Sequence, residues 1–191
     1  LPGRWHLVET AEDLSLDWLR GVSPRHVFFT HWSDRIPEEI YSAFECICFH
    51  MADLPFGRGG SPLQNLILAG HEETVLTFLR VEALLDAGPV YLKYPLDLSG
   101  RAREIYERVA DLVYGMVAEI IEKGVEPKPQ TGGPTVFKRR TPEQSRLPEK
   151  RTLEALYDHI RMLDAETYPP VFMDYGDFRI EFSPCRTGGR R

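Results

Sequence analysis

The chain has 191 residues, of which 42% are hydrophobic and 27% are charged, and its formal net charge is −6. A chain of this length buries one sizeable core, so we expect a single domain with a C-terminal appendage. The acidic balance argues against nucleic-acid binding by the chain as a whole, because such domains are usually basic.

Short apolar runs alternate with helical patterns along the chain, which predicts an α/β fold with a mostly parallel sheet. Leu14, Trp18 and Leu19 share one face of the first expected helix. Pro37 suits the first turn of the second helix. In chain order we expect a strand at 5–8, a helix at 14–21, a strand at 27–30, a helix at 37–44, a strand at 46–50, a helix at 62–69, and strands at 73–81 and 90–98.

The longest helix is expected over residues 99–123, because apolar side chains recur at spacings of three and four from Ile105 to Ile121. Gly124 is well placed to end it. The next segment, 125–150, contains five prolines and predicts a linker around one extended piece at 135–137.

A helix at 152–163 and a hairpin of strands 171–173 and 178–182 are expected to complete the fold. We therefore divide the chain into a core (1–124), a linker (125–150) and a helix-and-hairpin extension (151–191).

The three cysteines, Cys46, Cys48 and Cys185, form no disulfide framework and favour a reducing compartment, so we expect a cytoplasmic protein. No apolar run approaches the roughly 18 residues that cross a bilayer, and residues 1–20 lack the apolar segment of a signal peptide. The chain begins at Leu1 rather than at a methionine. We expect it to start inside a longer protein.

The strongest candidate for a reaction centre is His50, which ends an apolar strand and precedes a loop rich in proline and glycine. Ligands and catalytic groups of open α/β sheets gather at the carboxyl ends of strands. Asp86 lies in a later Asp-Ala-Gly-Pro segment. A His beside an Asp takes and returns a proton near neutral pH, although a histidine at the sheet edge and an aspartate in a turn explain the same residues.

A zinc site is a weaker interpretation of the same strand. Cys46, Cys48 and His50 alternate at period two and share one face, and Asp86 would complete a tetrahedron. The strand spreads the three side chains over roughly 13 Å, which is wide for one ion, and free cysteines are commonly buried. We therefore expect the cysteines to pack in the core and predict no metal.

A family resemblance rests on three segments: His50 to Pro55, Arg58 to Gln64, and Asp86 to Pro89. They resemble the tetrahydrofolate-dependent formyltransferases, which include glycinamide ribonucleotide and methionyl-tRNA formyltransferases. The separation of 36 residues between His50 and Asp86 fits the family spacing. Residues 137–145 and 160–169 resemble the region after the catalytic part in the tRNA and sugar-nucleotide branches, so the likeness covers most of 25–183.

The segment 49–62 is more similar still to small aminosugar N-formyltransferases of the pseudaminic acid type. This resemblance implies a Rossmann-like core and an enzyme that moves a formyl group from 10-formyltetrahydrofolate to the amine of an aminosugar. The sugar would be nucleotide-linked and destined for flagellin or surface glycans. The family's first strand and helix are not found before Trp5, so we expect part of the N-terminal unit to be absent.

The resemblance implies that His50 and Asp86 are catalytic, and it places Cys48 where the family has an asparagine. A thiol is a weaker donor than an amide, and loss of an oxyanion donor costs on the order of 100-fold to 1000-fold in rate. We expect protonated His50, or a backbone N–H of Gly59 or Gly60, to act as the replacement.

Further site residues follow from the resemblance. The folate ring would lie against Trp32, Ile36, Leu84, Leu85 and Asp86. The amine substrate would meet Arg58, Gly59, Gln64 and Lys138. Plain core packing is the alternative for Trp32 and Ile36, and a solvated surface position is the alternative for Lys138.

Other functions remain open. A methionyl-tRNA formyltransferase-like protein is the second interpretation, and a catalytically impaired folate- or sugar-nucleotide-binding homologue is another. We expect a small-molecule partner, no membrane and no nucleic acid. A homodimer through the C-terminal helix and hairpin is suggested by three aromatic residues that we expect to be exposed: Phe172, Tyr175 and Phe178.

Overall fold

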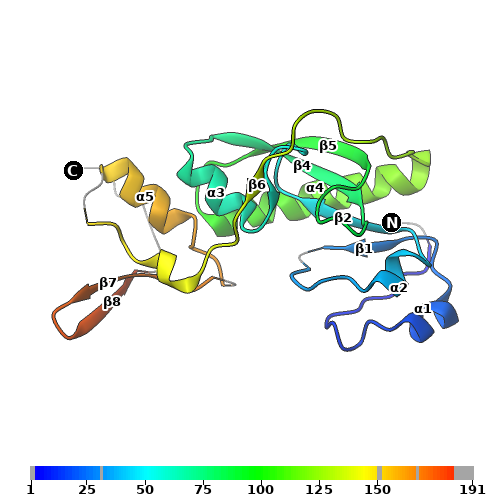
Figure 1. The fold of residues 1–191 in the computed structure, drawn as a ribbon, viewed down its shortest axis with the longest axis horizontal. Coiled ribbons are helices and arrows are strands. Elements are labelled where there is room, and N and C mark those ends of the chain that lie inside the picture. The colour runs from blue at the N-terminus through cyan, green and yellow to red at the C-terminus, as the bar shows by residue number, and fades with distance from the viewer. Residues whose placement is uncertain (1–2, 31, 150–151, 167, 183–191) are drawn as a thin grey trace.

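The computed structural model describes residues 3–30, 32–149, 152–166 and 168–182. Its centre is a four-stranded sheet in the order β1-β2-β4-β5, with helices on its two faces (Figure 1). The strands are β1 (Val27–Phe29), β2 (Cys46–His50), β4 (Glu73–Arg80) and β5 (Val90–Asp97). The α/β class expected from the sequence is confirmed.

Parallel pairing, which we expect for most of the sheet, joins β1 to β2. The other two pairings of this sheet are antiparallel, because β4 runs opposite to both β2 and β5. A parallel pair needs a long crossover connection, usually a helix, whereas β4 and β5 are joined by a loop. That loop carries Asp86, so the antiparallel pair brings this residue back to the sheet.

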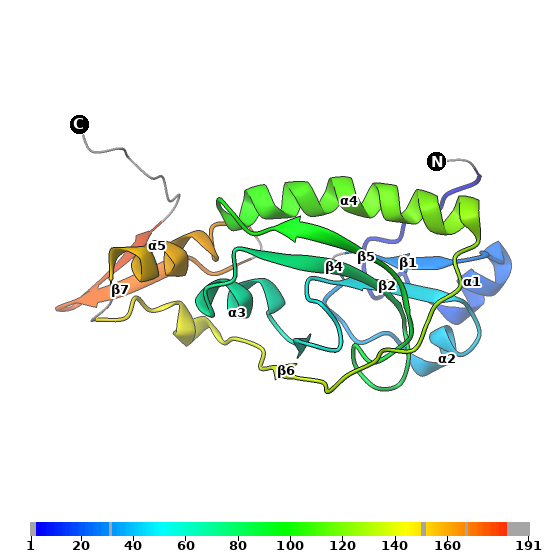
Figure 2. The same ribbon diagram turned by 90° about the horizontal axis from the view of Figure 1, so that it is seen from above.

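Two apolar clusters lie on opposite faces of β2, because its side chains alternate. Ile47 packs in the larger cluster with α4 (Ala102–Lys123), which lies along one face of the sheet (Figure 2). Cys46 packs in the smaller cluster with Leu19 of α1 (Leu16–Val22) and Ile40 of α2 (Glu38–Tyr41). The residues with even numbers on β2 therefore share the face that leads to His50.

Helix α4 follows its predicted pattern, with buried side chains at Ile105, Val109, Met116 and Ile120. Gly124 ends it in the left-handed conformation, and its N–H donates to the Ile120 carbonyl at 3.1 Å. The strand expected at 5–8 is wrong, since this segment has no strand pairing. The ring of Trp5 instead lies 6.4 Å from that of Phe28, so side-chain packing holds the segment without a backbone ladder.

The linker, residues 125–150, packs back on the core and pairs with the loop that follows His50. Strand β3 (Arg58–Gly59) of that loop pairs in parallel with β6 (Val136–Phe137). Helix α3 (Pro62–Leu68) follows β3, and a 3₁₀ turn (Pro142–Ser145) follows β6. The extended piece at 135–137 is thus confirmed, whereas its partner β3 was not predicted.

The extension consists of α5 (Leu153–Arg161) and a hairpin of β7 (Val171–Tyr175) and β8 (Phe178–Phe182), as expected. Arg161 fastens α5 to the core: its buried guanidinium donates to the carbonyls of Leu98 at 2.6 Å and Gly100 at 2.8 Å. The division of the chain into core, linker and extension stays a prediction.

Of the hairpin aromatics expected to be exposed, Tyr175 and Phe178 are exposed, but Phe172 is buried. Its ring is covered by the guanidinium groups of Arg146 at 5.1 Å and Arg179 at 3.9 Å. Cys185 lies outside the described residues. Within the described ranges, every helix is too short or too polar to cross a membrane.

Candidate active site

His50 is the last residue of β2, and its side chain is only 8% exposed. Its Nε2 lies 2.7 Å from the carbonyl oxygen of Gly57, in the loop that follows. Because a carbonyl only accepts, the hydrogen lies on Nε2. The sequence therefore fixes the imidazole tautomer by folding the glycine-rich loop back on to the end of β2.

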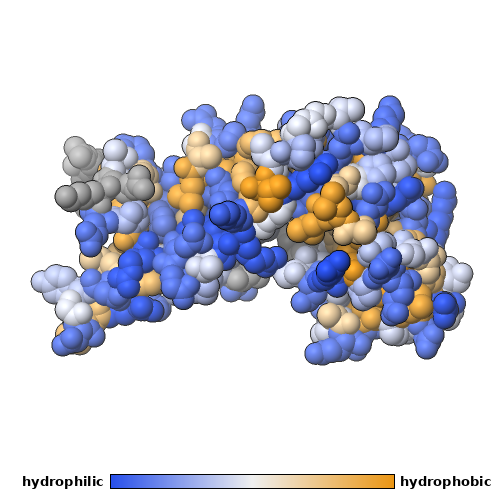
Figure 3. Space-filling model, viewed as in Figure 1, coloured by the Kyte–Doolittle hydropathy of each residue, from blue (hydrophilic) through white to orange (hydrophobic). Residues whose placement is uncertain are grey.

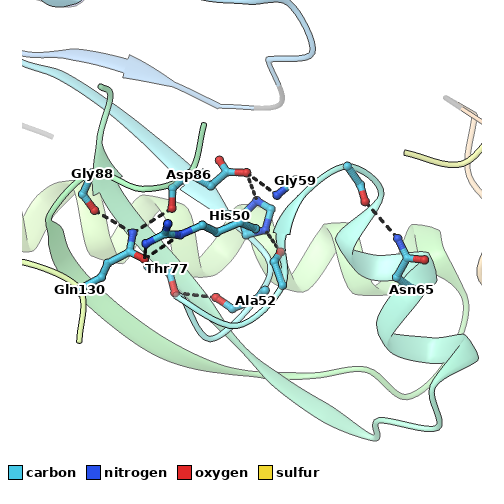
Figure 4. A network of polar contacts seen from close by, with 11 residues as sticks. His50, Ala52, Gly59, Asn65, Thr77, Asp86, Gly88 and Gln130 are labelled. Atoms are coloured by element: carbon cyan, nitrogen blue, oxygen red, sulfur yellow. Dashed lines mark hydrogen bonds and ion pairs between the residues drawn. The ribbon is translucent and has the colours of Figure 1, made fainter. Parts of the chain in front are cut away.

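Asp86 faces the other nitrogen of the same ring. Its Oδ2 lies 3.6 Å from His50 Nδ1 and accepts a hydrogen bond from the Gly59 N–H at 2.8 Å (Figure 4). The backbone of Asp86 is in the left-handed region, with φ of 53°. This conformation is uncommon for a residue other than glycine and needs support from its surroundings.

One proton can move within this pair. With Nε2 already protonated, neutral His50 presents the lone pair of Nδ1 to Asp86, and the imidazolium presents an N–H there. The separation of 3.6 Å exceeds a hydrogen bond, and catalytic contacts often tighten only when substrate binds. Asp86 Oδ1 has no hydrogen-bond partner among the described residues, which leaves this oxygen for a reacting group.

Cys48 lies on the same face of β2, two residues before His50. Burial raises the pKa of its thiol to about 12, and the negative charge of Asp86 adds to the effect. The thiol therefore stays protonated and is available only as a weak S–H donor. Cys46 is buried in the smaller cluster and Cys48 packs against it, so core packing accounts for both side chains, as expected.

The two backbone donors expected to replace the asparagine are already in use, so the glycine part of that expectation is wrong, and the part played by protonated His50 stays a prediction. Gly59 N–H donates to the Asp86 carboxylate, and Gly60 N–H donates to the Phe137 carbonyl at 3.1 Å. The pairing of β3 with β6 engages the Gly60 N–H, whereas the Gly59 N–H is engaged by the loop that carries Asp86.

The residues expected to contact the folate ring lie in two environments. Trp32 and Ile36 pack on the smaller cluster beside Cys48, and the Trp32 Nε1 atom is buried without a hydrogen-bond partner in the described chain. Leu84 and Leu85, next to Asp86, are 66% and 68% exposed. Leu84 and Leu85 thus lie on the Asp86 loop, Trp32 and Ile36 share a cluster with Cys48, and the role of all four in folate binding stays a prediction.

The residues expected to bind the amine substrate are not all together. Arg58 lies in β3 and donates from Nε and Nη2 to the Gln130 Oε1 atom, at 3.2 and 2.7 Å. The Lys138 side chain is exposed and directly follows β6, the strand that pairs with the glycine loop. Gln64 is placed elsewhere: it is 1% exposed and donates to the Met162 carbonyl at 3.3 Å, so it holds α3 against the extension.

Sequence reasoning missed two linker residues that reach into the site. Thr135 Oγ1 accepts from the Gly57 N–H at 2.7 Å. The Gln130 amide touches Arg58 and also donates to the carbonyls of Asp86 and Gly88. The flanking prolines at 127 and 129 indicate only an extended backbone, so the sequence carried no signal for these contacts.

The surface around the site is mixed. In the space-filling view, apolar side chains gather in the middle of the face between the N-terminal helices and the C-terminal hairpin, and hydrophilic residues surround them (Figure 3). Leu84 and Leu85, on the loop of Asp86, contribute exposed apolar side chains next to a carboxylate. This combination suits a ligand with a flat apolar part and a polar reacting group.

Comparison with known proteins identifies relatives over most of the chain. Residues 142–189 match the family described as methionyl-tRNA formyltransferase, C-terminal domain. A methionyl-tRNA formyltransferase from Sinorhizobium medicae is 31% identical over 139 residues, which are 67% of this chain and 44% of that protein. This chain thus spans less than half of that relative.

The solved structures agree with the fold. A methionyl-tRNA formyltransferase from Clostridium thermocellum is 43% identical, with a TM-score of 0.93, and the alignment covers 95% of this chain and 80% of that one. A sugar N-formyltransferase from a Shewanella species shares the fold, with a TM-score of 0.67 at 17% identity, over 87% of this chain and 71% of that one. Because the Clostridium relative is covered over most of its length at high identity, the chain belongs to the formyltransferase family that includes methionyl-tRNA formyltransferase.

Proposed function

We propose that this chain transfers a formyl group from 10-formyltetrahydrofolate to the amine of a methionyl-tRNA. The observation that carries the proposal is the Asp86 carboxylate: one oxygen is held by the Gly59 N–H and faces His50, while the other has no hydrogen-bond partner within the described ranges. Such a carboxylate is suited to accept a proton from an attacking amine. Family membership supports the formyl donor.

The chain's residues move one proton during the transfer. The donor supplies the formyl carbon, and the neutral amine of the acceptor forms the new C–N bond to it. Asp86 Oδ1 takes one proton from the amine nitrogen, and the imidazole of His50 stabilises or shares it through Oδ2 and Nδ1. The pair then returns the proton to the folate nitrogen as its bond to the formyl carbon breaks, which leaves a formamide and tetrahydrofolate.

Besides protonated His50, the donor left for the developing oxyanion is Cys48. Its protonated thiol shares a strand face with His50, while both glycine N–H groups are engaged. A weak donor at this position makes the transfer slow relative to a site with an amide donor.

The acceptor is argued from the relatives. The family matched by residues 142–189 and the Clostridium protein both carry the methionyl-tRNA name, which favours the second interpretation of the sequence over the aminosugar. The net charge of −6 favours a small acceptor, since tRNA is polyanionic. An aminosugar therefore stays as the second candidate, and the fold of the Shewanella protein is compatible with it.

The test is formyl transfer from 10-formyltetrahydrofolate to methionyl-tRNA and to a panel of nucleotide-linked aminosugars. His50→Ala and Asp86→Asn should lower turnover to a small residual rate, whereas Asp111→Asn, at an exposed carboxylate on α4, should not change it. Transfer to methionyl-tRNA, with binding that weakens steeply as salt rises, supports the proposal. If only a sugar is formylated, the acceptor is an aminosugar and not methionyl-tRNA. Folate binding without any transfer refutes the enzymatic function.

A further inference from the structure

One linker side chain joins the two loops that form the candidate site. The Gln130 Nε2 atom donates to the carbonyl of Asp86 at 2.9 Å and to that of Gly88 at 2.8 Å, and its Oε1 accepts from Arg58 (Figure 4). We propose that Gln130 is a positioning residue for formyl transfer, which holds the Asp86 carboxylate in its reactive place. This inference rests on the proposed function.

The N–H groups of the Gln130 side chain support the unusual backbone conformation of Asp86. Asp86 has φ of 53°, and residues in this region persist only when the surrounding structure supports them. The two hydrogens of Nε2 reach the carbonyls on either side of Ala87. Gln130 thereby closes the turn that aims the Asp86 side chain at His50.

The Oε1 atom of Gln130 holds the glycine loop through Arg58. Arg58 donates to Gln130 Oε1 through both Nε and Nη2, and it forms no ion pair with any described carboxylate. A cation on the amide oxygen polarises the amide and strengthens the hydrogen bonds that its N–H groups donate. Arg58 directly precedes Gly59, whose N–H holds Asp86 Oδ2.

The two ends of one amide therefore act on the same carboxylate. One end fixes the backbone that carries Asp86, and the other fixes the strand that supplies its hydrogen-bond donor. The effect of Gln130 should thus pass through Asp86 and disappear when the Asp86 carboxylate is removed.

Gln130→Glu separates these roles. It keeps the size of the side chain and the contact with Arg58, but it places a carboxylate oxygen against two carbonyls. We expect kcat with methionyl-tRNA to fall on the order of 100-fold, the cost of a displacement of about 1 Å, with KM changed less than about threefold, because binding is not what is lost. In an Asp86→Asn background, the same change should lower the residual kcat less than about twofold, because residues that act as a unit are non-additive.

Gln144→Glu is the matched control. It makes the same change in the same linker, at an exposed side chain whose Oε1 only caps the Thr141 N–H, and it should leave both constants unchanged. Equal losses in the wild-type and Asp86→Asn backgrounds, or a rise in KM with kcat intact, would overturn the proposal.

A second readout does not need turnover. The Gly59 amide proton donates to a carboxylate in the wild type, and charge-assisted hydrogen bonds of this kind are short and strong. Its NMR signal should move upfield in Gln130→Glu and in Asp86→Asn, and it should stay in place in Gln144→Glu. If the wild type transfers no formyl group, the proposed function fails while this shift still tests Gln130; an unmoved Gly59 signal in Gln130→Glu refutes the positioning role.

Discussion

The turn after Asp86 offers a perturbation whose size can be worked out from the structure. A Cβ added at Gly88 would lie 2.0 Å from the backbone carbonyl oxygen of Arg80. Ordinary contact begins at 3.4 Å, so Gly88→Ala requires the two atoms to separate by about 1.4 Å. Arg80 ends a strand with a neighbour on each side, and the loop must therefore move instead.

The displaced loop carries Asp86. A misplacement of about 1 Å costs roughly 100-fold in rate, and an overpacked contact costs about 1–3 kcal/mol in stability. We expect Gly88→Ala to lose on the order of 100-fold in kcat/KM for formyl transfer, with a fall of about 1–3 kcal/mol in the free energy of unfolding measured in urea.

Gly133→Ala is the control, since a Cβ there meets no atom within 4 Å. It should leave both activity and stability near those of the wild type. If Gly88→Ala kept kcat/KM within about twofold of the wild type, the idea that the position of this loop limits the rate would be refuted.

Three further predictions concern buried groups. Cys48→Asn should raise kcat on the order of tenfold or more, because an amide is a better oxyanion donor than a thiol; no gain, or an equal gain in Cys48→Ala, would contradict this. Thr77→Val should lower the unfolding free energy by about 1–3 kcal/mol, since the buried hydroxyl donates to the Ala52 carbonyl at 2.7 Å, whereas Thr74→Val on the same strand should not. Burial raises the pKa of Cys46 and Cys48 to about 12, with Glu45 and Asp86 adding to the rise, respectively. The neutral thiols therefore stabilise the fold below pH 9. Between pH 9 and pH 12 the unfolding free energy measured in urea should fall more steeply than in a double alanine variant. Equal slopes in the two proteins would count against the raised pKa values.

The sequence predicted the elements whose apolar pattern is decided locally. β2 and α4 were found because alternation and a spacing of three and four mark one buried face. The segment at 5–8 has the same apolar character but forms no ladder with the edge strand β1, and Trp5 packs on Phe28 of that strand instead. Pairing depends on the rest of the fold, and a single segment does not contain that information.

The site was predicted in part for the same reason. His50 and Asp86 were found from a strand end and a turn, and they do meet. Gln64 was expected at the site, but it lies on the buried face of α3 towards α5, a neighbour that only the tertiary structure reveals. Gln130 was overlooked because its contacts span more than 40 residues of chain and leave no periodic trace.

The buried guanidinium of Arg161 has a consequence for how the molecule comes apart. It joins α5 to the turn between β5 and α4 by donating to two carbonyls of that turn, those of Leu98 and Gly100. Undocking the helix would take the donor from these two carbonyls, which is costly where they stay buried, although the Arg161 charge itself is paired within the helix by Asp158 at 2.6 Å. Helix and sheet should therefore melt together in a single cooperative transition, and α5 should exchange its amide hydrogens as slowly as the strands of the four-stranded sheet.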